Sequence, residues 1–278
     1  MSDSPFAADV SAILIDGPEA EWSVTLADRW NVGRNQNGGV LLATTSGLLA
    51  QTVGQPDPFA VTGHFLGAAT AGPATVRASV VKPGRTYATA TGELWQDERE
   101  RVRVMGSYGD LTTRTTESEP PVVAVAPDVP VPERCEDLFE ILTATIGERS
   151  LTKSLRNFEI RVDPSGGWGP TAKPAQPRLS GWVRFRDEET VTPTMLLALA
   201  DGFPPSILGY VTIGWLPTVE LTVHVFAAPP VDEPWLRVEL HTRSIVGGLL
   251  DEDGELWDAT GRLVARFRQL AMLIPREA

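Results

Sequence analysis

The chain has 278 residues, which suits one large domain or two of about 150 residues each. Its apolar content of 42% and charged content of 22% exclude a disordered, collagen-like or disulfide-stabilised chain. Acidic residues outnumber basic ones by 36 to 24, and the net charge of −12 argues against nucleic acid and anionic membranes as partners. A single cysteine, Cys135, favours the reducing cytoplasm, and the absence of any apolar run of about 18 residues predicts no membrane span.

The first part of the chain is expected to contain one helix followed by strands. Residues 39–50 are the helix candidate, and residues 75–81 alternate between apolar and polar character, as a half-buried strand does. Residues 115–133 then contain prolines at spacings that prevent a helix or a central strand. This segment is therefore predicted to be an extended linker.

The second part of the chain is expected to follow the same order. Residues 135–142 have the apolar spacing of an amphipathic helix with acidic residues in its first turn. A second break rich in glycine and proline covers residues 163–178. After it come a helix candidate at 194–201 and a strand candidate at 235–240.

Three short matches relate the two parts of the chain. The tetrapeptide Gly-Glu-Leu-Trp begins at Gly92 and again at Gly254, residues 41–47 resemble residues 196–202, and Thr62 and His64 recur as Thr222 and His224. The matches occur in the same order in both parts, so we predict an α+β fold made of two copies of one module, in which an antiparallel sheet wraps around a helix. The expected boundaries are 1–116 for the first module, 117–134 for the linker and 135–278 for the second module.

Common catalytic signatures are missing from the sequence. There is no Gly-x-Ser-x-Gly elbow, no phosphate-binding Gly-x-x-x-x-Gly-Lys loop and no Gly-x-Gly-x-x-Gly fingerprint. The three histidines, His64, His224 and His241, do not have the spacing of metal ligands. We therefore expect no metal and no cofactor.

The two modules differ in polar residues at aligned positions. Asp201 aligns with Ser46, and Gln269 aligns with Ser107. Asp201 follows an apolar helix, so it is expected to be half-buried with a raised pKa, or else to cap nearby loop amides. Gln269 is either part of the same polar site or an exposed strand residue. This asymmetry suits a duplicated fold in which one copy keeps the site.

The motifs resemble those of a known family, the double-hotdog acyl-CoA thioesterases, and most closely the bacterial acyl-CoA thioesterase II type. Its first half is matched by residues 30–33, 37–43, 64–66 and 84–86, and its second half by residues 199–201, 217–224 and 263–271. The resemblance implies a double hotdog, with two antiparallel sheets that each wrap around one central helix.

In that family an aspartate, a threonine and a glutamine hold the attacking water. Carried over by position, these residues are Asp201, Thr218 and Gln269. The sequence departs from the family pattern after the threonine, where Glu220 and its neighbour replace an aspartate-histidine pair. Thr222 therefore remains a second candidate for the threonine.

The resemblance also implies contacts with the substrate. The candidate substrate-binding residues are Asn37, Gly38, Gly39, His64, Arg85 and Thr222. We expect the helix that begins near Gly38 and Gly39 to supply backbone amides to the tetrahedral oxyanion, although the two glycines would also suit a tight turn into the helix. Because coenzyme A is anionic, Arg85 and Arg34 are the candidates for a local basic patch.

The implied activity is hydrolysis of acyl-CoA to a fatty acid and CoA in lipid metabolism, in the cytoplasm. A hotdog hydratase would need an aspartate five residues before a histidine, a spacing that none of the histidines has. The alternative is a non-catalytic acyl-CoA-binding or scaffold protein with the same fold. Double hotdogs often associate further, so the resemblance also allows a homo-oligomer.

Overall fold

The computed structural model describes residues 5–15, 20–114, 122, 124–166, 176–187, 190–208 and 215–274. The first half comprises α1 Pro5–Asp9, β1 Ala12–Ile15, β2 Ala20–Leu26, β3 Asn31–Val32, β4 Asn35–Gln36, α2 Gly38–Val53, β5 Asp57–Phe65, β6 Gly72–Lys82, β7 Ala88–Gln96 and β8 Arg99–Gly109. The second half comprises β9 Glu136–Asp137, α3 Leu138–Ile146, β10 Phe158–Val162, β11 Arg178–Phe185, α4 Met195–Leu199, β12 Thr218–Val225, β13 Leu236–Val246, β14 Leu249–Trp257 and β15 Leu263–Met272.

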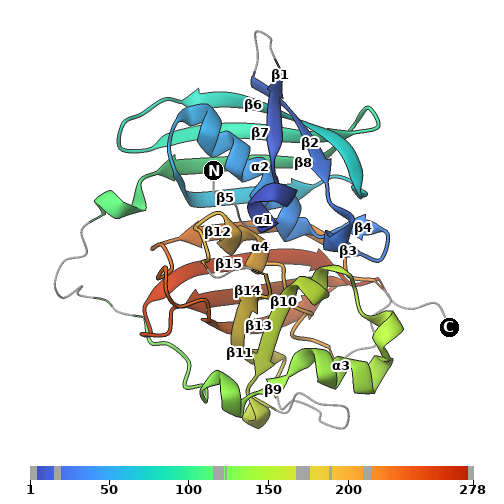
Figure 1. Cartoon of the computed structure of the whole chain (residues 1–278). Helices are drawn as coiled ribbons and strands as arrows, with labels where there is room; N and C mark the ends of the chain where they lie inside the picture. Colours follow the sequence, from blue (N-terminus) through green and yellow to red (C-terminus); the bar gives the residue numbers. More distant parts are fainter. Residues whose placement is uncertain are drawn as a thin grey trace.

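One continuous sheet runs through both halves of the molecule (Figure 1). Its strand order is β1-β2-β6-β7-β8-β5-β12-β15-β14-β13-β11-β10-β9, and β3 and β4 form a separate hairpin. The expectation of two separate sheets is wrong in this respect, because β5 and β12 pair with each other at the centre. Each of these strands would otherwise be an open edge of its own half, with unpaired backbone groups. A comparison of the two modules alone does not reveal which edges join.

The join between the halves is nearly symmetric. Thr62 on β5 lies opposite Thr222 on β12, with Val61 opposite Val223 and Gly63 opposite Leu221. The hydroxyl oxygens of Thr62 and Thr222 are 2.8 Å apart. Because Thr62 and Thr222 are also partners in the internal repeat, the two modules are related by a pseudo-two-fold axis that passes through this pair.

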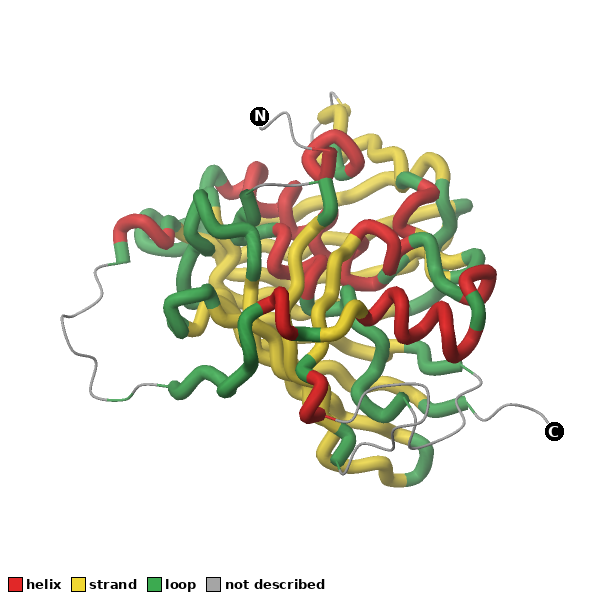
Figure 2. Tube along the Cα trace, turned by 60° about the horizontal axis from the view of Figure 1, so that its bottom comes forward, coloured by secondary structure: helices red, strands yellow, loops and turns green. Residues whose placement is uncertain are grey.

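The helices α2 and α4 lie together on one side of the sheet, and the core lies between them and the strands (Figure 2). Almost every residue of α2 between Gly39 and Ala50 is buried, which explains its apolar composition all round. The Asn37 side chain caps its start by accepting from the amide of Val40, and Gly54 ends it in the left-handed conformation. The helix is therefore fixed at both ends.

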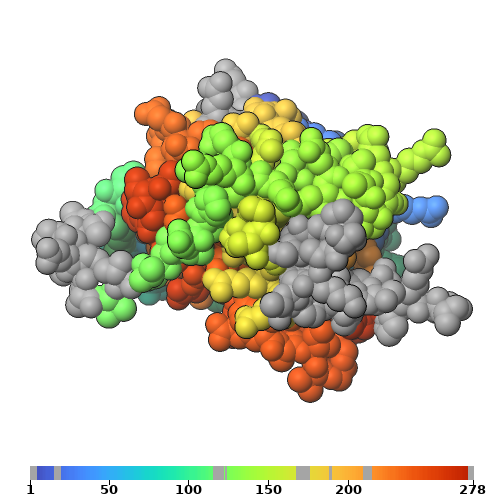
Figure 3. All heavy atoms as spheres, turned by 90° about the horizontal axis from the view of Figure 1, so that it is seen from below, coloured from blue at the N-terminus to red at the C-terminus, as the bar shows by residue number. Residues whose placement is uncertain are grey.

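α3 and the chain around it cover the end of the second half that lies away from the first half. This end faces the viewer in Figure 3, where α3 is coloured yellow-green. α3 begins at Leu138 because the Asp137 side chain accepts from the amides of Phe139 and Glu140, so the expected helix at 135–142 starts later and runs on to Ile146. The expected linker at 117–134 and the second break at 163–178 lie partly outside the described residues. Among the described helices, none is long and apolar enough to cross a membrane.

Candidate active site

Asp201 lies where the two central helices meet. It follows the C-terminal end of α4, and its Oδ2 atom accepts from the backbone amide of Gly39 and from Nδ2 of Asn37, both at 3.0 Å. Nδ2 of Asn37 also donates to the backbone carbonyl of Asp201 at 2.7 Å. The carboxylate of one module is thus held at the helix N-terminus of the other, where the positive end of the helix dipole stabilises a negative charge.

Glycine is required at the start of α2 because α4 approaches so closely. A Cβ atom on Gly39 would lie 2.8 Å from Cβ of Asp201 and 2.9 Å from the carbonyl oxygens of Leu197 and Ala198. A Cβ atom on Gly38 would lie 3.0 Å from Oδ2 of Asp201. The amide of Gly39, which we expected to bind a substrate oxyanion, donates to Asp201 instead.

The electrostatic surroundings shift the protonation of Asp201. The pKa of Asp201 is raised from 3.8 to about 6, mainly by burial and to a smaller extent by the negative charge of Glu252. The backbone amides of Gly39 and Gly38 oppose this shift, because they donate to the ionised form. The hydrogen bonds from Asn37 and Gly39 both reach Oδ2 of the carboxylate.

Thr218 and Gln269 form a second pair of polar side chains on the helix-facing side of the sheet. Oγ1 of Thr218 donates to Oε1 of Gln269 at 3.0 Å, and Gln269 is buried. Thr218 stands just before a register shift in β12, which changes the direction in which its side chain points relative to the rest of the strand. Thr222, the other candidate, contacts Thr62 and Glu220 and lies opposite Arg268, so it faces the outer surface.

Glu252 on β14 connects Gln269 to the loop that follows Asp201, and the sequence analysis missed it. Its Oε1 accepts from Nε2 of Gln269 at 2.9 Å, and its Oε2 accepts from the amide and the hydroxyl of Ser206 at 2.7 and 2.6 Å. The side chain is 2% exposed. A signal was present in the sequence, since Glu252 shares its strand face with the buried residues Leu250 and Leu256.

The structure does not bring the other predicted substrate-binding residues to Asp201. His64 is exposed on β5, pairs with Glu220 across the strands and faces away from the helices. Arg85 is exposed, and its carbonyl accepts from Gln55 beyond the C-terminal end of α2. That end lies about 24 Å from the N-terminus of this 16-residue helix. Arg34 is also exposed, on the turn between β3 and β4 that precedes α2.

The pairing of the strands corrects one alignment of the two modules. Thr62 pairs with Met105 and its counterpart Thr222 pairs with Arg268, so the residue that corresponds to Gln269 is Gly106. The expected counterpart, Ser107, is wrong by one residue. A shift of one residue moves a side chain to the other face of a sheet, so the correction changes which residues occupy the equivalent site.

The fold and the site together define a class of protein. A sheet that wraps around two packed helices is the architecture of a hotdog protein. Here it carries a carboxylate at a helix N-terminus and a threonine–glutamine pair. Residues 26–109 match the model of the acyl-CoA thioesterase N-terminal domain, and residues 132–273 match that of the C-terminal domain. The chain therefore belongs to the acyl-CoA thioesterase family.

The chain is also similar to known proteins over nearly its whole length. An uncharacterized protein of Mycobacterium tuberculosis is 29% identical over 281 residues, which cover 89% of each chain. A Thermobifida fusca structure, described as that of a proposed thioesterase II, has a TM-score of 0.85 and 26% identity, with 99% of each chain covered. A hotdog-fold protein of unknown function from Alicyclobacillus acidocaldarius has a TM-score of 0.84 at 19% identity over 99% of this chain and 100% of its own.

Proposed function

We propose that the protein hydrolyses acyl-CoA thioesters with a water molecule that Asp201 activates and that Thr218 and Gln269 orient. The single observation that carries this proposal is the anchored carboxylate of Asp201, whose Oδ2 accepts from Gly39 and Asn37 at the N-terminus of α2. A pKa of about 6 leaves this carboxylate ionised near neutral pH, yet basic enough to accept a proton. A thioester is reactive enough to need no covalent nucleophile.

The chemistry follows from these groups. Asp201 takes a proton from the water as the water oxygen adds to the carbonyl carbon of the thioester. The tetrahedral intermediate then collapses, the carbon–sulfur bond breaks, and the proton on Asp201 passes to the sulfur of CoA. A well-placed general base contributes about 10²–10⁴-fold to the rate. The hydroxyl of Thr218 and the amide of Gln269 are the polar groups that would hold the water near its attack position.

Purified protein assayed against short-, medium- and long-chain acyl-CoAs tests this proposal. Release of the CoA thiol would be followed with a thiol-reactive dye, beside Asp201→Asn and Gln269→Ala. Turnover that both variants lose supports the assignment, and turnover that both retain contradicts it. Binding of acyl-CoA without turnover would support the alternative of a non-catalytic acyl-CoA-binding or scaffold protein.

A further inference from the structure

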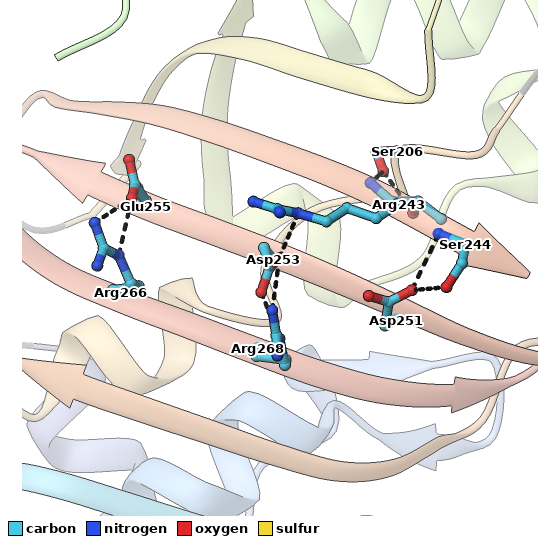
Figure 4. A network of polar contacts seen from close by, with 9 residues as sticks. Ser206, Arg243, Ser244, Asp251, Asp253, Glu255, Arg266 and Arg268 are labelled. Atoms are coloured by element: carbon cyan, nitrogen blue, oxygen red, sulfur yellow. Dashed lines mark hydrogen bonds and ion pairs between the residues drawn. The ribbon is translucent and has the colours of Figure 1, made fainter. Parts of the chain in front are cut away.

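The acidic residues of β14 fall into two groups that point to opposite faces of the sheet. Asp251, Asp253 and Glu255 face outward and have partners on the neighbouring strands (Figure 4). Asp253 pairs with Arg268 and Arg243, Glu255 pairs with Arg266, and Asp251 accepts from Ser244. Each of the three is therefore explained by contacts at the outer surface.

Glu252 faces inward, and its surroundings are different. Among the described residues, its hydrogen-bond donors are Nε2 of Gln269, the amide and hydroxyl of Ser206, and the hydroxyl of Thr242. In the described part of the chain no arginine, lysine or histidine forms an ion pair with it. A buried carboxylate without a cation is costly. Stability alone does not account for its presence, because apolar residues occupy the same face on either side.

The contacts of Glu252 determine how Gln269 is oriented. A carboxylate only accepts hydrogen bonds, so Gln269 must turn its Nε2 group toward Glu252 and its Oε1 atom toward Thr218. Without a carboxylate at position 252, the two ends of the amide could exchange. The hydroxyl of Thr218 would then lose its acceptor.

The same carboxylate anchors the loop that carries Asp201. Ser206 lies five residues after Asp201 and is fully buried, with its amide and hydroxyl both donating to Oε2 of Glu252. The next residue, Ile207, packs against Leu250 and Ala271. The loop is thus attached to β14 by polar contacts at Ser206 and by apolar contacts at Ile207.

From these contacts we infer that Glu252 is a positioning residue of the active site, which orients the amide of Gln269 and holds the loop after Asp201 in place. The inference rests on the proposed function, because Gln269 and Asp201 are the groups that it positions. Glu252 acts on the reaction through these two residues and is not assigned a contact with the substrate.

The test compares Glu252→Gln with Asp251→Asn, which removes the same charge from the adjacent residue on the outer face. Glu252→Gln keeps the size of the side chain, but its NH₂ group would face one of the groups that donate hydrogen bonds to the Glu252 carboxylate. We expect kcat to fall about tenfold with KM changed less than about twofold. Asp251→Asn should leave both values unchanged. Thermal unfolding of both variants checks that each is folded.

Two further readouts separate positioning from a merely structural role. Loss of the negative charge of Glu252 should lower the pKa of Asp201, for which Glu252 is the only charged influence among the described residues. The acidic limb of the kcat/KM profile should therefore move to lower pH in Glu252→Gln and stay in place in Asp251→Asn. NMR titration of the aspartate carboxyl carbons should show the same shift without any substrate, so the test does not depend on the choice of acyl-CoA.

The outcomes distinguish this inference from the proposed function. If Asp201→Asn and Gln269→Ala lose activity but Glu252→Gln matches Asp251→Asn in rate and titration, the role of Glu252 is overturned and the proposed function stands. If Asp201→Asn and Gln269→Ala keep their activity, the proposed function fails. Should Glu252→Gln not fold, Glu252→Asp keeps the charge but shortens its reach. That variant should lower kcat without moving the acidic limb, and an unchanged kcat would contradict the inference.

Discussion

The two halves of the sheet have corresponding strands, apart from β9 at the end of the second half, but they carry different residues at corresponding positions. In the strand pairing, the polar residues of the second half correspond to non-polar residues of the first: Thr218 to Pro58, Glu252 to Ala90 and Gln269 to Gly106. The helix alignment pairs Asp201 with Ser46. Both halves even share a register shift, after Pro58 and after Thr218. The two modules therefore share their backbone arrangement, while at these corresponding strand positions the polar side chains occur in the second half only.

Tyr108 fills the place in the first half that the polar cluster occupies in the second. A Cβ atom on Gly106 would overlap the hydroxyl oxygen of Tyr108, so the ring lies directly over this glycine. The hydroxyl pairs with Ser46 at 3.1 Å, and both residues are fully buried. Burial also raises the pKa of Tyr108, which keeps it neutral. The difference teaches that the second half supplies the candidate catalytic side chains, whereas the corresponding positions of the first half supply packing.

The largest expected effect is the loss of the carboxylate in the active half. Asp201→Asn should lower kcat about 10³-fold, because a general base contributes about 10²–10⁴-fold. Ser46→Ala, the matched change in the other half, should leave kcat within about twofold. Steady-state hydrolysis of an acyl-CoA measures both. Equal losses in the two variants would break the comparison.

The next effect concerns the groups that would hold the water. Gln269→Ala should lower kcat about 10²-fold, and Thr218→Ala about tenfold, because the water loses its orienting partners. Thr222→Ala should have no effect on kcat, since Thr222 contacts Thr62 on the outer face. The same assay decides between the two threonines. A loss in Thr222→Ala without one in Thr218→Ala would reverse the assignment.

A smaller effect, on stability, is expected at Gly106, where the ring of Tyr108 fills that place in the first half. Gly106→Ala should destabilise the fold by about 2 kcal/mol, because the added methyl group overlaps a buried ring that has no room to move. Denaturant unfolding measures the change, with Ser107→Ala on the opposite face of β8 as the control. The folded Gly106→Ala protein should keep its activity. A lower kcat with unchanged stability would show that this part of the first half contributes to catalysis.

The smallest effect concerns the buried hydroxyl pair. Tyr108→Phe should cost about 1 kcal/mol of unfolding free energy, because it leaves the hydroxyl of Ser46 without its partner. Adding Ser46→Ala should cost little more, since the pair is lost already. A double-mutant cycle of unfolding free energies tests this coupling. Strictly additive changes would show that the hydrogen bond contributes nothing.

Much of this arrangement was predictable from the sequence. The internal repeat predicted two related modules, and the apolar run at 39–50 predicted α2. The carboxylate after the second helix, which has no acidic counterpart in the first module, indicated Asp201. These signals are local, because periodicity and residue type report on the chain near each residue. The residues that resemble the thioesterase family added Thr218 and Gln269, which the structure shows in contact.

The remainder depends on contacts between distant segments. The pairing of β5 with β12 could not be predicted, because any two edge strands can satisfy each other's backbone groups. The engagement of the Gly39 amide by Asp201 depends on how closely two helices pack. Gln269 was misaligned with Ser107 because the connection between the paired residues of β14 and β15 is one residue longer than that between those of β7 and β8, which a single sequence offset does not report. Glu252 could have been predicted from the sequence, since a charged residue on the buried face of a strand indicates a functional or specially paired group.

The pH dependence of kcat/KM, compared between the wild-type protein and Asp201→Asn, tests the central claim most directly. The raised pKa means that Asp201 gains its proton as the pH falls through about 6, so the base is active above that value and lost below it. The wild-type rate should fall about tenfold for each pH unit below about 6, and the residual rate of Asp201→Asn should lack this limb. The same limb in both proteins would show that another group titrates, and would contradict the role of Asp201 as the base.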